Sequence, residues 1–276
     1  VGKPAIYRRY PDKVALVDRT RCVTYSQLAA TANRIANTLA AAFGNGVRVG
    51  YLGKNSAAFY EVWLGANRAG CALVPFNWRS APRELAALLA DADPAILVVG
   101  SGFSQLARDA LRQSPVQAYV LDENSLGEWL SDAHEGRPRF PPIADGIALL
   151  TYTSGTTGVP KGVAITNGAL VQWFRAAESD PDTAWRSSDV GLMVMPNFHL
   201  AGTWVSLPAL MHGATLVVLP AFEPDTFLSA VSEYGVTRTC LVPTAIEAVV
   251  QALHNYPADL TSLRSVMYAG SPIASH

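Results

Sequence analysis

The stretch TYTSGTTGVPKG, residues 151–162, combines six hydroxyl side chains, three glycines and one lysine in twelve positions. Glycines let backbone amides turn toward an anion, hydroxyl groups donate hydrogen bonds, and a lysine adds a mobile positive charge. Charge-assisted hydrogen bonds contribute about 1.5–3 kcal/mol each. The stretch is therefore predicted to bind a polyphosphate, and the expected contacts are Thr153, Ser154, Gly155, Thr156, Thr157, Gly158 and Lys161.

The stretch differs from a Walker phosphate loop. A Walker loop that began at Gly155 would need a second glycine where Pro160 stands and Ser or Thr where Gly162 stands. No helix is expected directly after Lys161, so no helix dipole would add to its charge there. From composition alone, a flexible surface hairpin rich in glycine and threonine is an equally good interpretation.

The elements around this loop predict an α/β fold. Strand-like runs are expected at 47–52, 72–76, 95–100, 116–121, 147–152, 162–166, 189–195, 214–219, 236–242 and 265–270. Helices are expected at 24–43, 56–68, 82–90, 103–111, from 167 onward, 225–234 and 244–254. Such alternation indicates mainly parallel sheets covered by helices on both faces.

Two similar layered αβα subdomains are predicted. The connector EGRPRFPPIADG, residues 135–146, is rich in proline and glycine and separates a first subdomain, 1–140, from a second, 141–276, that carries the loop. Local signals also mark single elements. Thr24 and Gln27 form a capping-box pattern at the start of the first long helix, and Gly44 is suited to end it.

The composition excludes several classes of partner. The 276 residues are 50% hydrophobic and 16% charged, with a net charge of −1, which favours neither nucleic acid nor an anionic membrane. No apolar run reaches the roughly 18 residues that span a bilayer. Cys22, Cys71 and Cys240 are far apart and lack metal-site spacing, so we expect buried thiols in a reducing, cytoplasmic compartment.

The segment YTSGTTGVPKG, 152–162, resembles the phosphate-binding signature of the adenylate-forming enzymes. This family includes acyl-CoA synthetases, aryl-CoA ligases, firefly luciferase and the adenylation domains of peptide synthetases. Other segments resemble family segments in the same order: VTYSQL (23–28), NRAGCALVPFN (67–77), MPNFHLAG (195–202) and YAGSPI (268–273). The resemblance covers the whole chain, and MPNFHLAG is similar to a segment of the acyl-CoA synthetases.

The resemblance implies a reaction. The family uses ATP and Mg²⁺ to convert a carboxylate to an acyl-adenylate and pyrophosphate, and a thiol, usually that of coenzyme A, then displaces AMP. Donors aimed at the phosphates would stabilise the charge that grows on pyrophosphate. An apolar acid, a fatty acid in the first instance, is expected. The alternatives are an aryl-CoA ligase, an adenylation domain serving a carrier protein, and a non-catalytic nucleotide- or lipid-binding fragment.

The resemblance also assigns roles to residues. Lys161 and His199 are expected to be catalytic, and His199, Gly202 and Trp204 are expected to border the acyl group, although Trp204 is equally plausible as a core residue. Adenine is expected at Gly270, Ser271 and Pro272, and no residue is assigned to a metal. Carboxylates elsewhere are expected at the solvated surface: Asp12, Asp18, Glu84, Asp91 and Asp93.

Several family features have no counterpart before His276. They are a magnesium-binding glutamate, a ribose-binding aspartate and a small C-terminal domain with a catalytic lysine. The resemblance therefore implies an N-terminal part that is inactive alone and whose second subdomain is incomplete at its C-terminus. The expected partners are small molecules, and a homodimer is left open.

Overall fold

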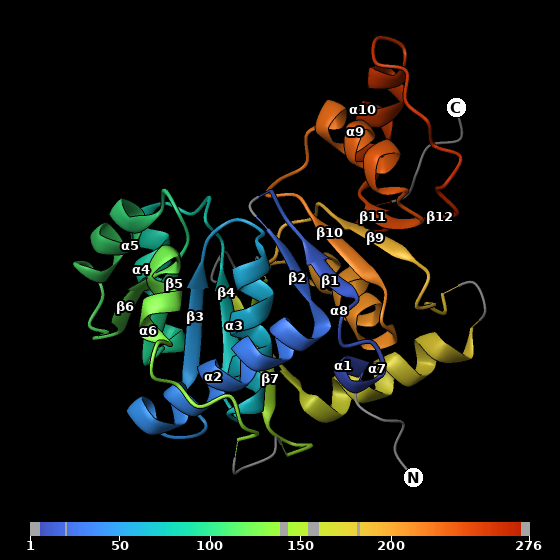
Figure 1. Ribbon diagram of the computed structural model, residues 1–276. Helices are drawn as coiled ribbons and strands as arrows, with labels where there is room; N and C mark the ends of the chain where they lie inside the picture. The colour runs from blue at the N-terminus through green and yellow to red at the C-terminus, as the bar shows by residue number, and fades with distance from the viewer. Residues whose placement is uncertain (1–5, 20, 139–142, 154–159, 181–182, 272–276) are drawn as a thin grey trace. The chain divides into compact units, whose positions relative to one another are not determined.

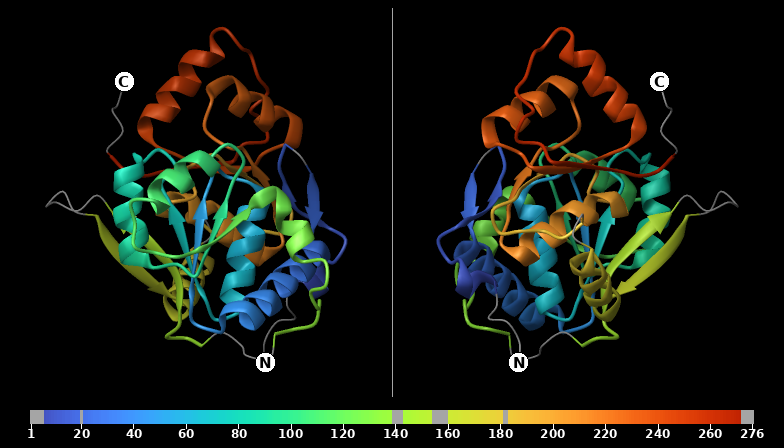
Figure 2. Two further views of the ribbon diagram at one scale, coloured as in Figure 1. Left: turned by 90° about the vertical axis from the view of Figure 1, so that its left-hand side faces the viewer. Right: turned by 90° about the vertical axis from the view of Figure 1, so that its right-hand side faces the viewer.

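The computed structural model describes residues 6–19, 21–138, 143–153, 160–180 and 183–271, including the main chain but not the side chain of Trp204. It contains two six-stranded sheets with helices against them (Figures 1 and 2). The predicted α/β class with two sheets is confirmed. Within the described ranges, no helix is long and apolar enough to cross a membrane.

The chain divides into two compact units that differ from the predicted subdomains. The first comprises Val1–Leu28, Asn55–Ala57 and Glu178–His276, and the second comprises Ala29–Lys54 and Ala58–Ala177. The predicted boundary at residue 140 does not coincide with this division, because sheet membership follows hydrogen bonding between strands rather than order along the chain. Strands from the start of the chain join the sheet of the late residues, and the two strands of 147–166 join the sheet of the early ones.

The sheet of the first unit has four central strands and two edges. From one edge to the other its strands are β12 (Ser265–Tyr268), β11 (Arg238–Leu241), β9 (Val190–Met193), β10 (Thr215–Val218), β1 (Val14–Val17) and β2 (Cys22–Thr24). All neighbours are parallel except β1 and β2, which are antiparallel.

Helices of the first unit bury apolar side chains against this sheet. Its helices are α1 (Ile6–Arg9), α8 (Leu200–His212), α9 (Pro224–Tyr234) and α10 (Pro243–Leu253). α8 packs against β9, β10 and β11, and α9 and α10 lie side by side (Figure 1). Phe227 and Val231 of α9 share a buried cluster with Leu192 of β9 and Val217 of β10. Each such side chain contributes about 1.5–3 kcal/mol on burial.

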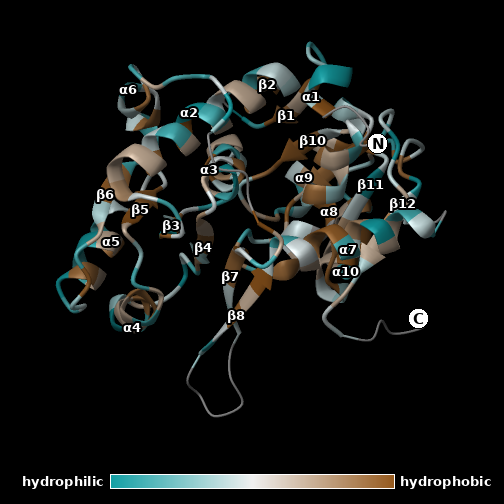
Figure 3. Cartoon of the chain, turned by 90° about the horizontal axis from the view of Figure 1, so that it is seen from below, coloured by the Kyte–Doolittle hydropathy of each residue, from teal (hydrophilic) through white to brown (hydrophobic). Residues whose placement is uncertain are grey.

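The sheet of the second unit ends in the strands on either side of the predicted phosphate loop. From one edge to the other it runs β6 (Tyr119–Asp122), β5 (Ile96–Val99), β3 (Arg48–Leu52), β4 (Ala72–Phe76), β7 (Ile147–Thr153) and β8 (Lys161–Thr166), an order visible in Figure 3. The neighbours are parallel except β7 and β8.

The helices of the second unit include two that begin in, and one that ends in, the first. They are α2 (Tyr25–Phe43), α3 (Ala57–Arg68), α4 (Pro82–Ala92), α5 (Ser104–Leu111), the 3-10 turn η1 (Glu123–Ser125), α6 (Leu126–Trp129) and α7 (Asn167–Ser179). Leu85 and Leu89 of α4 and Ala107 of α5 share a buried cluster with Phe76 and Leu97 of the strands.

The capping signals read from the sequence are confirmed at α2. The Thr24 N–H donates to the Gln27 side chain (2.8 Å), and the Gln27 N–H donates to the Thr24 hydroxyl (3.2 Å). At the other end Gly44 has a φ of +78°. A left-handed glycine directly after the last helical residue is a common helix stop.

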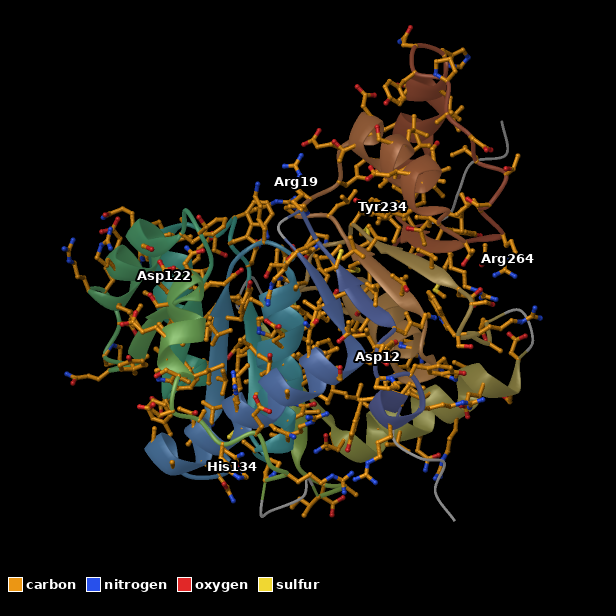
Figure 4. The ribbon with its side chains drawn as sticks, in the orientation of Figure 1. Asp12, Arg19, Asp122, His134, Tyr234 and Arg264 are labelled. Atoms are coloured by element: carbon orange, nitrogen blue, oxygen red, sulfur yellow. The ribbon has the colours of Figure 1, made fainter. Side chains whose placement is uncertain are left out.

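Two expectations about exposure are wrong. Cys22 is exposed, whereas Cys71 and Cys240 are buried. Asp12 is exposed as expected (Figure 4), but Asp18 is half-buried, and the Ala57 N–H at the start of α3 donates to its carboxylate (2.8 Å). Asp18 therefore stabilises a helix N-terminus, where a negative charge is favourable.

Candidate active site

The predicted phosphate loop joins two antiparallel strands. Thr153 ends β7, Lys161 begins β8, and these two residues are directly opposite each other in the register. Both are exposed. Lys161 was expected in the loop and is instead the first residue of the strand. The remaining predicted phosphate contacts, Ser154, Gly155, Thr156, Thr157 and Gly158, lie outside the described residues.

The base of the loop is tied to α4. The Tyr152 hydroxyl donates to the carboxylate of Asp91 (2.6 Å), an exposed residue of α4. Burial and this carboxylate raise the pKa of Tyr152, so the phenol remains a donor even in alkaline solution where an ordinary tyrosine ionises. This bond connects the end of β7, from which the loop starts, to α4.

His199 is the N-cap of α8, with φ −106° and ψ 147°. Its side chain is exposed, and its ring lies 4.5 Å from the ring of buried Phe198. The His199 N–H donates to the Pro196 carbonyl (3.1 Å), and the Gly202 N–H donates to the His199 carbonyl (2.9 Å). His199 thus stands at the N-terminus of a 13-residue helix, where backbone N–H groups and the helix dipole favour an anion.

Gly202 lies against the turn that carries His199. A Cβ atom on Gly202 would come within 2.7 Å of the Pro196 carbonyl oxygen and 2.8 Å of the Met193 Cε. The absence of a side chain therefore lets the first turn of α8 approach residues 193–197. Trp204 is on α8, but its side chain lies outside the description, so the contact of Gly202 and Trp204 with an acyl chain stays a prediction.

The predicted adenine contacts follow β12. Gly270 has a φ of +101°, a conformation that favours glycine, and Ser271 is exposed. Pro272 lies outside the described residues. The turn is at the carboxyl end of a parallel strand, which is where open α/β sheets bind ligands. Adenine binding stays a prediction.

A buried carboxylate that sequence reasoning did not single out lies at the opposite end of the same sheet. Asp189 precedes β9, its side chain is buried, and it forms ion pairs with Arg238 (3.4 Å) and Arg264. The Arg186 N–H also donates to it (2.8 Å). Figure 4 labels Arg264, which directly precedes β12. The sequence contains a signal for this cluster, because its three charged residues lie at the amino ends of strands that are neighbours in the sheet.

No part of the described chain offers an evident metal site. The described ranges hold no group of three or more His, Cys, Asp or Glu side chains that could bind a metal ion. Mg²⁺ usually binds nucleotide phosphates and waters together with only one or two carboxylates. Such a site does not need a cluster of protein ligands, and we assign Mg²⁺ no residue of this chain.

Comparison with known proteins identifies the class. The family model described as AMP-binding enzyme matches residues 5–276. The chain therefore belongs to the AMP-binding enzyme family, as its motifs predicted.

Particular relatives differ in the acid and the acceptor that their names state. The chain is 31% identical over 268 residues to the fatty acid–[acyl-carrier-protein] ligase ScoC of Streptomyces coeruleorubidus, covering 96% of this chain and 51% of the relative. It is 34% identical over 268 residues to feruloyl-CoA synthase of an Amycolatopsis species, covering 96% and 53%. The chain thus spans about half the length of these curated relatives.

A solved structure shows the same fold. The inhibitor-bound N-terminal domain of FACL13 from Mycobacterium tuberculosis superposes with a TM-score of 0.89 at 29% identity, covering 98% of this chain and 69% of that one. The similarity extends over both six-stranded sheets, since almost the whole chain is matched.

Proposed function

We propose that this chain binds ATP and an apolar carboxylic acid in an AMP-forming acid–thiol ligase. In the first step a carboxylate oxygen bonds to the α-phosphorus of ATP, and the bond from that phosphorus to the bridging oxygen breaks, releasing pyrophosphate. In the second step the thiol of coenzyme A loses its proton to solvent and its sulfur bonds to the acyl carbon. The bond from that carbon to the oxygen shared with phosphorus breaks, and AMP leaves with this oxygen. Family membership supports this proposal.

The observation that carries the proposal is the place of His199 at the N-cap of α8, within the segment MPNFHLAG. An imidazole beside the N–H groups of a helix N-terminus suits a carboxylate. His199 would orient the acid for attack on the α-phosphorus. Gly202 and Trp204, further along α8, would border its apolar part.

The nucleotide would be bound by the loop and by the turn after β12. Thr153 and Lys161, together with the loop residues between them, would hold the phosphates and stabilise the charge that develops on pyrophosphate. Gly270, Ser271 and Pro272 would contact adenine. Mg²⁺ is proposed only as the companion of the ATP phosphates.

The acid and the acceptor are finer parts of the proposal. We favour a fatty acid and coenzyme A. The second candidate is an aryl acid, because the feruloyl-CoA synthase shares 34% identity against 31% for the fatty-acid ligase. A carrier-protein thiol is the second candidate acceptor. A cytoplasmic location and a homodimer stay predictions.

The test is Lys161→Ala in the full-length protein. The variant should lower acid-dependent exchange of labelled pyrophosphate into ATP by about 10²–10³-fold, the usual effect of removing one charge-stabilising donor. Exposed Lys161 begins an edge strand, so the fold should persist. Exchange would be measured with fatty acids of graded length and with aryl acids, and circular dichroism would verify folding.

The control for Lys161 is Arg112→Ala. Arg112 is 73% exposed and follows α5, away from the carboxyl ends of the strands, so its loss should leave exchange unchanged. A folded Lys161→Ala protein with wild-type exchange would contradict the phosphate role. A wild-type protein that shows no exchange with any acid of the panel would contradict the proposed function.

A further inference from the structure

Asn55 has a buried carboxamide whose partners are all main-chain groups of distant segments. Its side chain is 3% exposed. The Nδ2 group donates to the carbonyl oxygens of Met195 (3.0 Å) and Leu219 (3.1 Å), and Oδ1 accepts from the N–H of Asn197 (2.9 Å). Exchanging the amide nitrogen and oxygen would set an oxygen against two carbonyls, so the partners determine the orientation of the amide.

These partners define what Asn55 does in the first unit. Met195 and Asn197 enclose Pro196 in the turn that leads to His199, and Leu219 follows β10, the neighbour of β9. One side chain therefore holds the chain as it leaves two adjacent parallel strands. Met195 and Asn197 are themselves buried, so loss of the carboxamide would leave main-chain groups without these partners in a region with little water.

Gly202 and a main-chain hydrogen bond also constrain the turn that leads to His199. Gly202 packs against Pro196 and Met193 so closely that no Cβ would fit, and the His199 N–H is bonded to the Pro196 carbonyl. Asn55 and Gly202 thus both constrain the backbone between Met195 and Asn197, the segment that leads to His199. The direction in which His199 points is thereby tied to the amide of Asn55.

We propose that Asn55 is a positioning residue for the acid: it holds the turn so that His199 meets the carboxylate. The inference rests on the proposed function of His199 and concerns the acid alone. Misplacement of a substrate-orienting group by about 1 Å can cost about 10²-fold in rate. Removal of the carboxamide should therefore impair use of the acid and leave use of ATP unchanged.

The variants are Asn55→Ala, Asn55→Asp and Asn55→Ser in the full-length protein. The Asp variant keeps the shape and the acceptor but removes both donors, and the Ser variant keeps one short donor. We expect kcat/KM for the acid, measured by pyrophosphate exchange, to fall by about 10²-fold for the Ala and Asp variants, less for Ser, with KM for ATP unchanged. Rates are taken per folded protein.

The matched control is Asn67→Ala. Asn67 is a half-buried amide of the second unit that donates to the carbonyl of Ala148 (2.8 Å). Its removal tests the cost of losing a hydrogen bond from an amide side chain to the main chain at a position far along the chain from His199. This variant should lower the melting temperature without changing the kinetics of the acid.

A double-mutant cycle separates positioning from general stability. In a His199→Ala background, a change at Asn55 should have no further effect on acid kinetics, because the two residues act as one unit. Additive effects, or wild-type acid kinetics in a folded Asn55→Ala or Asn55→Asp protein, would overturn this inference while leaving the proposed function intact. A wild-type protein without acid-dependent exchange would overturn both.

Discussion

Gly202 shows how a missing side chain shapes the candidate acid site. The residue was expected to border the acyl group, and the structure places it against the turn that precedes His199. Close approach of two backbone segments is a common reason for glycine at one position. Its contact with the turn is a packing role that the motif alone did not reveal.

We predict that Gly202→Ala destabilises the protein by about 1–3 kcal/mol, the usual cost of adding one methyl group to a packed site. The new Cβ would overlap the Pro196 carbonyl oxygen at 2.7 Å. The measurement is urea denaturation. Gly127→Ala in α6 is the control, because a Cβ there would meet nothing within 4 Å, and the change should leave stability unchanged or raise it by up to about 1 kcal/mol. Equal stability of the Gly202→Ala and Gly127→Ala proteins would contradict the prediction, because it would show that the turn shifts to make room for the new Cβ atom.

At the scale of elements, Asp189 links three strands of the first sheet. It precedes β9 and pairs with Arg238 at the start of β11 and with Arg264 before β12. These positions are the amino ends of the strands, whereas His199 and Gly270 follow the carboxyl ends of β9 and β12. The cluster is therefore assigned to strand association and not to chemistry.

We predict that Asp189→Ala lowers the free energy of unfolding by about 3–5 kcal/mol, because it leaves the largely buried guanidinium of Arg238 without its carboxylate partner. Arg112→Ala is the comparison. It breaks an exposed pair with Asp109 (3.3 Å), and such pairs contribute at most about 1 kcal/mol. Chemical denaturation of both variants measures the difference, and similar losses would contradict the assignment.

At the scale of the whole molecule, the three cysteines differ in burial. Cys71 and Cys240 are buried in different units, and burial raises the pKa of both, that of Cys240 to about 11. Protonated thiols react poorly, because the thiolate is the nucleophile. Cys22 on β2 is exposed.

We predict that a thiol reagent at neutral pH modifies Cys22 in the native protein and all three cysteines after denaturation. Ellman's reagent counts the reactive groups directly. In Cys22→Ser the native protein should react slowly, at a rate set by opening of the fold. Rapid reaction of two or more thiols in the native wild type would contradict the packing of Cys71 or Cys240.

The sequence by itself determined most local elements. The run at 72–76 is a strand with those same ends, because five consecutive apolar residues shortly after Gly70 are long enough for a strand and too short for a typical helix. Thr24, Gln27 and Gly44 set the ends of α2. The motifs also determined the family and the segments that could hold phosphate, carboxylate and adenine, since those segments are continuous in the chain.

Only the tertiary structure decided how distant segments combine. α8 was not expected, because Leu200–His212 is apolar on all sides and contains Pro208, so no polar stripe marks a helix. The division of the chain into units depends on strand pairing, and Asn55 meets its partners 140 to 164 residues away. The local hydrophobic periodicity of the sequence does not predict such pairings, because their hydrogen bonds form between parts of the chain that only the fold brings together.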